Sequence, residues 1–132
     1  MYHNGIRLIA LAAALITLTL MVYMALPWCD NYAYRNLWGY VGLLGFAVWA
    51  ILPYLVTIFL ARKASASQAK SLLVIIGTLI ISLGGVAMYV DAVLLHPDPQ
   101  GGLVFIAVPC YQWIILGVLT GTYLLLNKKY TS

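Results

Sequence analysis

Apolar residues form four long runs along this chain, and polar residues are concentrated in the segments between and beside the runs. The runs are Leu8–Leu26, Leu37–Leu60, Leu72–Leu95 and Leu103–Leu126, and the one charged residue within them is Asp91. Each run approaches the roughly 20 residues that an α-helix needs to cross a hydrocarbon core of about 30 Å. The pattern therefore predicts an all-α membrane protein of four transmembrane helices.

Short connections place consecutive helices next to each other in antiparallel pairs, which predicts an up-down-up-down bundle. We expect a single transmembrane domain over 1–132, with helices at about 6–27, 37–60, 71–95 and 102–126. The last segment has two interpretations. It is either one tilted helix kinked at Pro109, which we favour, or a helix that begins at Pro109 after an extended or re-entrant stretch, Leu103–Val108.

Charged residues are sorted by sign between the two ends of the predicted bundle. One end holds six of the seven Lys and Arg residues, namely Arg7, Arg62, Lys63, Lys70, Lys128 and Lys129. The three acids and the remaining base, Arg35, belong to the opposite end. Because cytoplasmic loops carry an excess of Lys and Arg, this sorting predicts that both termini are cytoplasmic. We expect an integral protein of a bacterial inner membrane.

The composition indicates that nearly the whole chain lies within the membrane. The chain is 64% hydrophobic and 8% charged, so no extramembrane module with its own core is expected. The net charge of +4 matches anionic lipid headgroups, which attract each basic residue by about 1 kcal/mol. The lipid bilayer is therefore the first expected partner, and nucleic acid is not expected to bind.

Residues that suit recognition gather at the predicted outer end. The candidate binding residues are charged, amide or aromatic side chains of this outer rim: Arg35, Tyr89, Asp91, His96, Asp98, Gln100, Tyr111, Gln112 and Trp113. Tyr and Trp are common at membrane interfaces and also in protein–protein contacts. The outer rim is therefore either an ordinary interfacial belt or a surface that binds another protein.

The position of Asp91 decides between two roles for this carboxylate. It lies about 30 Å along the third helix when counted from Ser71, which places it at the outer interface rather than at mid-bilayer. We favour a structural role there, such as a pair with Arg35 or bonds to Tyr hydroxyls, over a ligand or proton site. The bilayer centre is expected to hold hydroxyl side chains, such as Thr78 and Ser82, but no acid, base, Asn or Gln.

Neither the cysteines nor the histidines form a catalytic or metal-binding pattern. Cys29 and Cys110 either form a disulfide or remain two unpaired thiols, which we favour, and no Cys-x-x-Cys motif is present. His96-Pro-Asp98 is a loop pattern rather than a metal-ligand motif. No nucleotide loop or Ser/His/Asp signature occurs either. We expect no enzyme activity, no metal and no cofactor.

Gly117 and Gly121 form a GxxxG motif in the fourth run. Small residues at this spacing let transmembrane helices approach closely. We favour packing inside the bundle, and the alternative is a homo-oligomer interface.

The sequence favours a non-catalytic membrane protein whose aromatic and acidic outer rim binds another membrane or periplasmic protein. An accessory subunit or an immunity-type protein would fit. The alternative is a small oligomeric transporter or channel with Asp91 near its outer entrance. That alternative has less support, because proton-coupled transport usually needs a titratable group along the membrane path.

Overall fold

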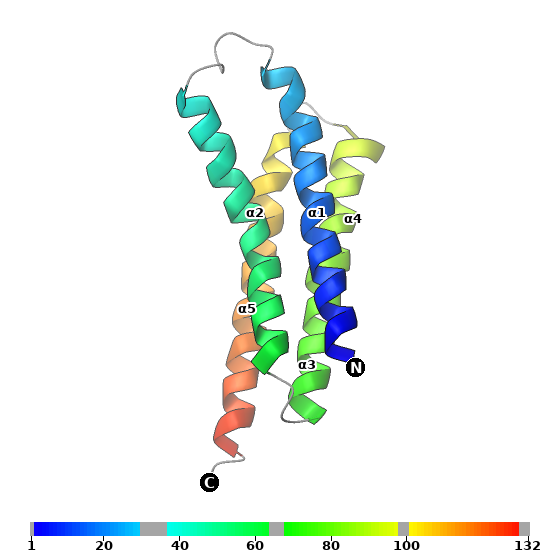
Figure 1. The fold of residues 1–132 in the computed structure, drawn as a ribbon, viewed down its shortest axis with the longest axis vertical. Helices are drawn as coiled ribbons and strands as arrows, with labels where there is room; N and C mark the ends of the chain where they lie inside the picture. Colours follow the sequence, from blue (N-terminus) through cyan, green and yellow to red (C-terminus); the bar gives the residue numbers. More distant parts are fainter. Residues whose placement is uncertain (1, 30–36, 64–67, 98–100, 130–132) are drawn as a thin grey trace.

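The computed structural model describes residues 2–29, 37–63, 68–97 and 101–129. All of its elements are helical: α1 (Tyr2–Cys29), α2 (Leu37–Lys63), α3 (Gln68–Leu79), η2 (Ile80–Gly84), α4 (Gly85–Val90), η3 (Asp91–Leu95), η4 (Gly101–Leu103) and α5 (Val104–Lys129). The elements from α3 to η3 follow one another without a break, and η2 and η3 are π-helical turns within this segment. In Figure 1 the long helices lie side by side, with both chain termini at the same end.

Four helical segments are long and apolar enough to cross a membrane: Asn4–Ala25, Leu37–Lys63, Gln68–Leu95 and Val104–Leu126. A helix is the form expected of such segments, because hydrocarbon offers no partner to backbone N–H and C=O groups. The prediction of an all-helical protein with four spanning segments is confirmed in this form. The apolar helices are consistent with contact with a lipid bilayer.

The start of the fourth span decides between the two interpretations of residues 103–108. Val104–Val108 belongs to α5 and is helical rather than extended, and Pro109 lies inside the helix. Proline lacks an N–H group, so the carbonyl of Phe105 loses its usual helical partner. Pro109 is fully buried. The interruption therefore faces protein and not lipid.

The spans are arranged as a bundle in which each long helix packs against several others. α1 contacts α2, α3 and α4, while α5 contacts α2, α3 and α4. We call the two ends of the bundle the Asp91 end and the Lys63 end. Figure 1 shows that both termini lie at the Lys63 end, and that the Leu37 end of α2 lies at the Asp91 end.

Two clusters of buried side chains fill the bundle. The cluster toward the Lys63 end consists of Ala13, Ala14, Tyr54, Leu60, Ala61, Val74, Ile81, Leu116 and Leu119. The cluster toward the Asp91 end consists of Leu20, Met21, Tyr89, Val93, Phe105 and Val108. Each cluster draws on several spans, so the interior is packed along most of its length.

Close helix contacts occur at Gly77 and Gly85. A methyl group at Gly77 would come within 2.6 Å of Leu119 Cδ1, and one at Gly85 would come within 2.8 Å of the Tyr54 hydroxyl. Gly117 and Gly121 are instead exposed, and a Cβ added there would meet no described atom within 4 Å. The prediction that Gly117 and Gly121 pack inside the bundle is wrong, because their side of α5 faces outward.

The two halves of α2 differ sharply in burial. The buried residues of this helix are Ala50, Pro53, Tyr54, Thr57, Leu60 and Ala61, all in its second half. Residues 37–49 are exposed or half-buried throughout. The first half of α2 therefore contributes no fully buried side chain, although Leu43 and Ala47 pack against the cluster at the Asp91 end and Trp49 lies against Trp113. This half diverges from the other helices in Figure 1.

Candidate functional site

At the Asp91 end, the one ion pair among the described residues joins Asp91 and His96. Asp91 Oδ1 lies 2.9 Å from His96 Nδ1, and the His96 backbone N–H donates to the Asp91 carbonyl at 2.8 Å. The π-helical turn η3 brings residues five apart into register, which explains both contacts. The side chains are 59% and 79% exposed, so the pair is a surface feature. The described partner of Asp91 is His96, while the predicted partner Arg35 lies outside the described residues, so that pairing stays a prediction.

Several of the predicted outer-rim residues are in fact interior. Tyr89 and Gln112 are 0% exposed, and Trp113 is only half-buried but packs against Trp49 with ring centroids 6.1 Å apart. The prediction that these three residues belong to an exposed outer rim is therefore wrong. Gln112 finds a hydrogen-bond partner inside the bundle that lipid would not offer, and Tyr89 packs its ring on Phe105.

The exposed outer rim is consequently smaller than the sequence indicated. Tyr111 is exposed at 40%, but it lies on α5 one residue before Gln112 rather than at the helix end. Asp98 and Gln100 lie outside the described residues, like Arg35. The exposed outer-rim residues that the structure describes at the Asp91 end are therefore Asp91 and His96.

Packed aromatic side chains lie directly beneath Asp91. Tyr89 stacks on Phe105 with ring centroids 4.9 Å apart and an interplanar angle of 26°. Both rings belong to the buried cluster that also contains Val93 and Val108. The interior between Asp91 and the bundle centre is therefore filled by apolar and aromatic side chains.

The bundle centre holds a group of polar side chains contributed by all four spans. Thr17 Oγ1 and the Tyr54 hydroxyl lie 3.1 Å apart and share a hydrogen bond. Gln112 Nε2 donates to the Ile81 carbonyl at 3.2 Å. Both the Tyr54 hydroxyl and the Gln112 amide lie against the bare Cα of Gly85, which leaves them space.

Gln112 belongs to these interior polar groups, whereas the sequence assigned it to the outer rim. This residue lies eight positions after the start of α5, about 12 Å into the span. The sequence contains one signal that would have located the polar centre. Thr78, Ser82, Gly85 and Tyr89 follow one another at helical spacing and so share one face of the third span.

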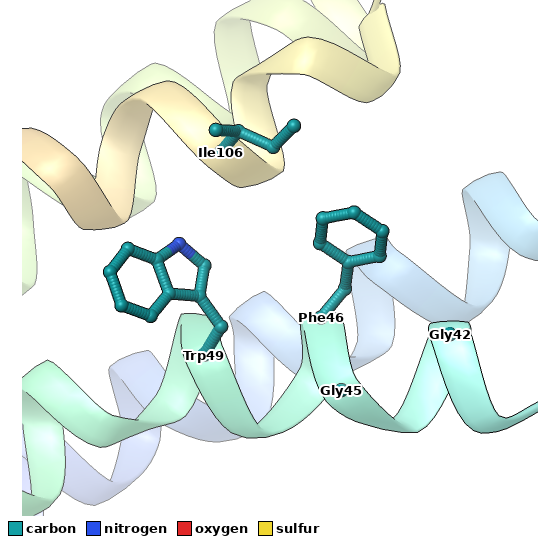
Figure 2. A pocket seen from close by; sticks show the side chains of 5 residues that line it. All are labelled: Gly42, Gly45, Phe46, Trp49 and Ile106. Carbon is teal, nitrogen blue, oxygen red and sulfur yellow. The ribbon is translucent and has the colours of Figure 1, made fainter.

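An apolar groove lies between the first half of α2 and the beginning of α5. It has a volume of about 400 Å³ and is lined by Gly42, Gly45, Phe46, Trp49 and Ile106. Figure 2 shows Phe46 and Trp49 extending from α2 on the side that faces Ile106 of α5. Gly42 and Gly45 have no described atom within 4 Å of an added Cβ. Their backbone is therefore open to a neighbour.

The cysteines give no sign of a disulfide. Cys110 is a free, exposed cysteine on α5, and the side chain of Cys29 lies outside the part that is described. Among the described residues, no three His, Cys, Asp or Glu side chains gather as metal ligands. These observations assign no chemistry to either cysteine.

The Lys63 end is held by contacts between basic and aromatic residues. The Tyr123 hydroxyl donates to the Lys63 carbonyl at 3.2 Å, which links α5 to the end of α2. Lys70 Nζ lies 5.7 Å from the centre of the Tyr123 ring, and Lys63 Nζ lies 4.7 Å from that of Phe59. Cation–π contacts of this kind keep the amines at the wet end of the helices.

Comparisons of the chain with protein-family models, with curated proteins and with solved structures give no match.

Proposed function

We propose that this chain is a non-catalytic membrane protein that binds a transmembrane helix of another protein along the first half of α2. One observation carries this proposal: no residue of 37–49 in α2 is fully buried, and this stretch exposes Trp38, Tyr40 and Phe46. Trp38 is 79% exposed. The exposed side of this half of α2 is thus available to a partner.

A transmembrane helix fits this surface better than a lipid chain does. The open backbone at Gly42 and Gly45 allows close approach of another helix, and membrane helices associate by such backbone approach and close packing. The walls formed by Phe46, Trp49 and Ile106 give the groove a defined shape. A rigid helix of complementary shape gains more van der Waals contact in such a groove than a mobile acyl chain does.

The outer rim supplies the polar part of the same contact. Asp91 and His96 are exposed at the end of the bundle where α2 begins. Polar side chains around an apolar centre are the usual organisation of a protein–protein interface. Asp98, Gln100 and Arg35 are assigned to this outer rim from the sequence alone.

The charge distribution supports a particular orientation for this surface. The basic residues at the Lys63 end favour a cytoplasmic location for both termini, which places the Asp91 end on the outer side. In a bacterial inner membrane the partner would then be met in the outer half of the bilayer or in the periplasm.

The alternative function of a transporter has weaker support. The Tyr89–Phe105 stack and its neighbours fill the interior beneath Asp91, where a solute route would begin. Binding of a partner needs no such route. For this reason the binding function is preferred.

Site-specific photo-crosslinking in native membranes tests the proposal. A crosslinker placed at Phe46 is expected to capture one membrane protein, and peptide mapping should locate the link within a transmembrane segment of that protein. Gly45→Leu should fill the groove and abolish the crosslink. Gly121→Leu is the matched control, because Gly121 is equally open but lies on α5.

Three results would contradict the proposal. Links to lipid alone would assign the groove to acyl chains, and links to a second copy of this chain would make it a homo-oligomer interface. A protein crosslink that survives Gly45→Leu would place the contact elsewhere.

A further inference from the structure

Four polar side-chain atoms of fully buried residues have no partner in the described part of the protein. They are Thr78 Oγ1, Ser82 Oγ, Tyr89 Oη and Gln112 Oε1. All four residues are 0% exposed. Buried polar groups in proteins almost always have a hydrogen-bond partner, since an unpaired one costs stability. Four such atoms in one region therefore indicate a ligand that supplies the missing bonds.

Hydroxyls of threonines on α1 and α2 show how unusual Thr78 and Ser82 are. Thr19 donates to the Leu15 carbonyl at 2.9 Å, and Thr57 donates to the Tyr54 carbonyl at 2.7 Å. This bond to the preceding helical turn is the common solution for a buried threonine in a membrane helix. Thr78 and Ser82 make no such bond. Their hydroxyls are therefore free to bond a group outside their own helix.

The helical spacing and the contacts of Gln112 bring these groups together. Thr78, Ser82 and Tyr89 lie on the face of the third span that also contains Gly85. Gln112 Nε2 contacts Gly85 and donates to the Ile81 carbonyl, one residue before Ser82. The amide oxygen of Gln112 is therefore held at this face, beside the π-helical turn η2 that contains Ser82.

The chemistry of the four atoms selects the ligand. Three hydroxyls can each donate and accept a hydrogen bond, and the amide oxygen accepts. None of the four side chains is charged, so an ion would have no counter-charge in the membrane interior, where that is costly. A small neutral molecule that both donates and accepts satisfies the set, and water is the usual occupant of such polar interiors.

We infer that water binds inside the membrane-spanning bundle at a site formed by Thr78, Ser82, Tyr89 and Gln112, with Ser82 and Gln112 bridged across η2. We call these four residues the hydration site. The hydration site extends along the third span, because Thr78 lies about one turn before Ser82 and Tyr89 about two turns after it. Water inserted at a widened helical turn also solvates backbone groups that the turn exposes.

Solid-state NMR of the full chain in liposomes tests this inference through magnetisation transfer from water to side chains. Transfer to Thr78 and Ser82 is expected to be several-fold faster than transfer to Thr57. Thr57 is the matched control because it is also 0% exposed but has its hydroxyl bonded to its own helix. It is six residues from the end of α2, whereas Thr78 is ten from the start of α3. Thr78 is thus farther from the helix end than Thr57. A stronger signal at Thr78 therefore cannot arise because Thr78 lies closer to bulk water.

Variants separate a bound water from general wetting of the bundle. Ser82→Ala should reduce transfer from water to the Gln112 side-chain amide, while Thr57→Ala should leave it unchanged. Equal, slow transfer at Thr57, Thr78 and Ser82 would show a dry interior and overturn the inference. Equal, fast transfer at all three, or no effect of Ser82→Ala on Gln112, would also overturn it.

Discussion

The two halves of α2 are both apolar, but only the second half contains fully buried residues. Residues from Ala50 onward contribute a buried stripe, whereas Leu37–Trp49 contributes none. In water both halves would be driven inside, but lipid is as apolar as leucine and provides no such drive. Burial in this protein therefore follows shape and hydrogen bonding. The packed half supplies Ala50, Tyr54 and Thr57, whose small or hydroxyl side chains meet these requirements.

Glycines show the same contrast. Gly85 has the Tyr54 hydroxyl and the Gln112 amide against its Cα, while Gly42 and Gly45 have no described neighbour within reach of a Cβ. A glycine permits close approach but does not cause it. A partner with matching groups decides whether the approach occurs, and at Gly85 the hydrogen-bonding side chains are that partner.

The largest loss of stability is expected from Gly85→Val, because the added carbons would displace Gln112 from the Ile81 carbonyl and press on Tyr54. Overpacking of this kind costs about 3 kcal/mol or less in most proteins, and the lost hydrogen bond adds to it. Steric trapping in bicelles measures the free energy of unfolding. Gly84→Val is the control, because nothing lies within 4 Å of a Cβ there. Equal losses in the two variants would contradict the role of Gly85.

A leucine placed in each half of α2 tests the comparison directly. Ala50→Leu is expected to lose about 2 kcal/mol, because Ala50 is 0% exposed and a larger side chain would overpack its surroundings. Gly45→Leu should cost nothing and gain up to about 1 kcal/mol from better helix formation. The same unfolding measurement compares them. A loss from Gly45→Leu as large as that from Ala50→Leu would show that the first half is packed.

Tyr54→Phe should have a smaller effect, since it removes the hydroxyl that bonds Thr17 but leaves the ring in place. Side-chain bonds between membrane helices contribute about 0.6 kcal/mol on average and about 1.7 kcal/mol at most. Tyr40→Phe is the matched change in the exposed half and should leave unfolding unaltered. A double-mutant cycle with Thr17→Val assigns the loss to this bond, and additive single changes would contradict it.

Asp91→Asn is expected to change stability least. Exposed ion pairs contribute about 0–1 kcal/mol, and the His96 N–H keeps its bond to the residue 91 carbonyl in the variant. Thermal unfolding in detergent at low and high salt measures the effect. A loss comparable to that of Ala50→Leu would show that the exposed Asp91 end is as critical as the buried stripe.

Some site predictions required only local information and others did not. Counting residues along a helix predicts an interfacial position for Asp91, and the side chain of Asp91 is exposed in the structure. Gln112 was misplaced because rotation about the helix axis, and not only depth, decides whether an amide faces outward or inward. The prediction that Gly117 and Gly121 pack inside the bundle is wrong for the same reason, since the GxxxG spacing does not say which face of the helix another helix covers.

The sequence by itself determined that four apolar helices of membrane-spanning length form, because hydrocarbon thickness and the backbone's need for hydrogen bonds act on each segment separately. Only the tertiary structure decided which faces pack. In a bilayer the hydrophobic effect does not favour one apolar helix face over another for burial. Which face packs against another helix therefore depends on steric fit and on hydrogen bonds between helices. Gly85, Tyr54 and Gln112 meet this requirement together, whereas Gly45 and Phe46 are left open along the groove.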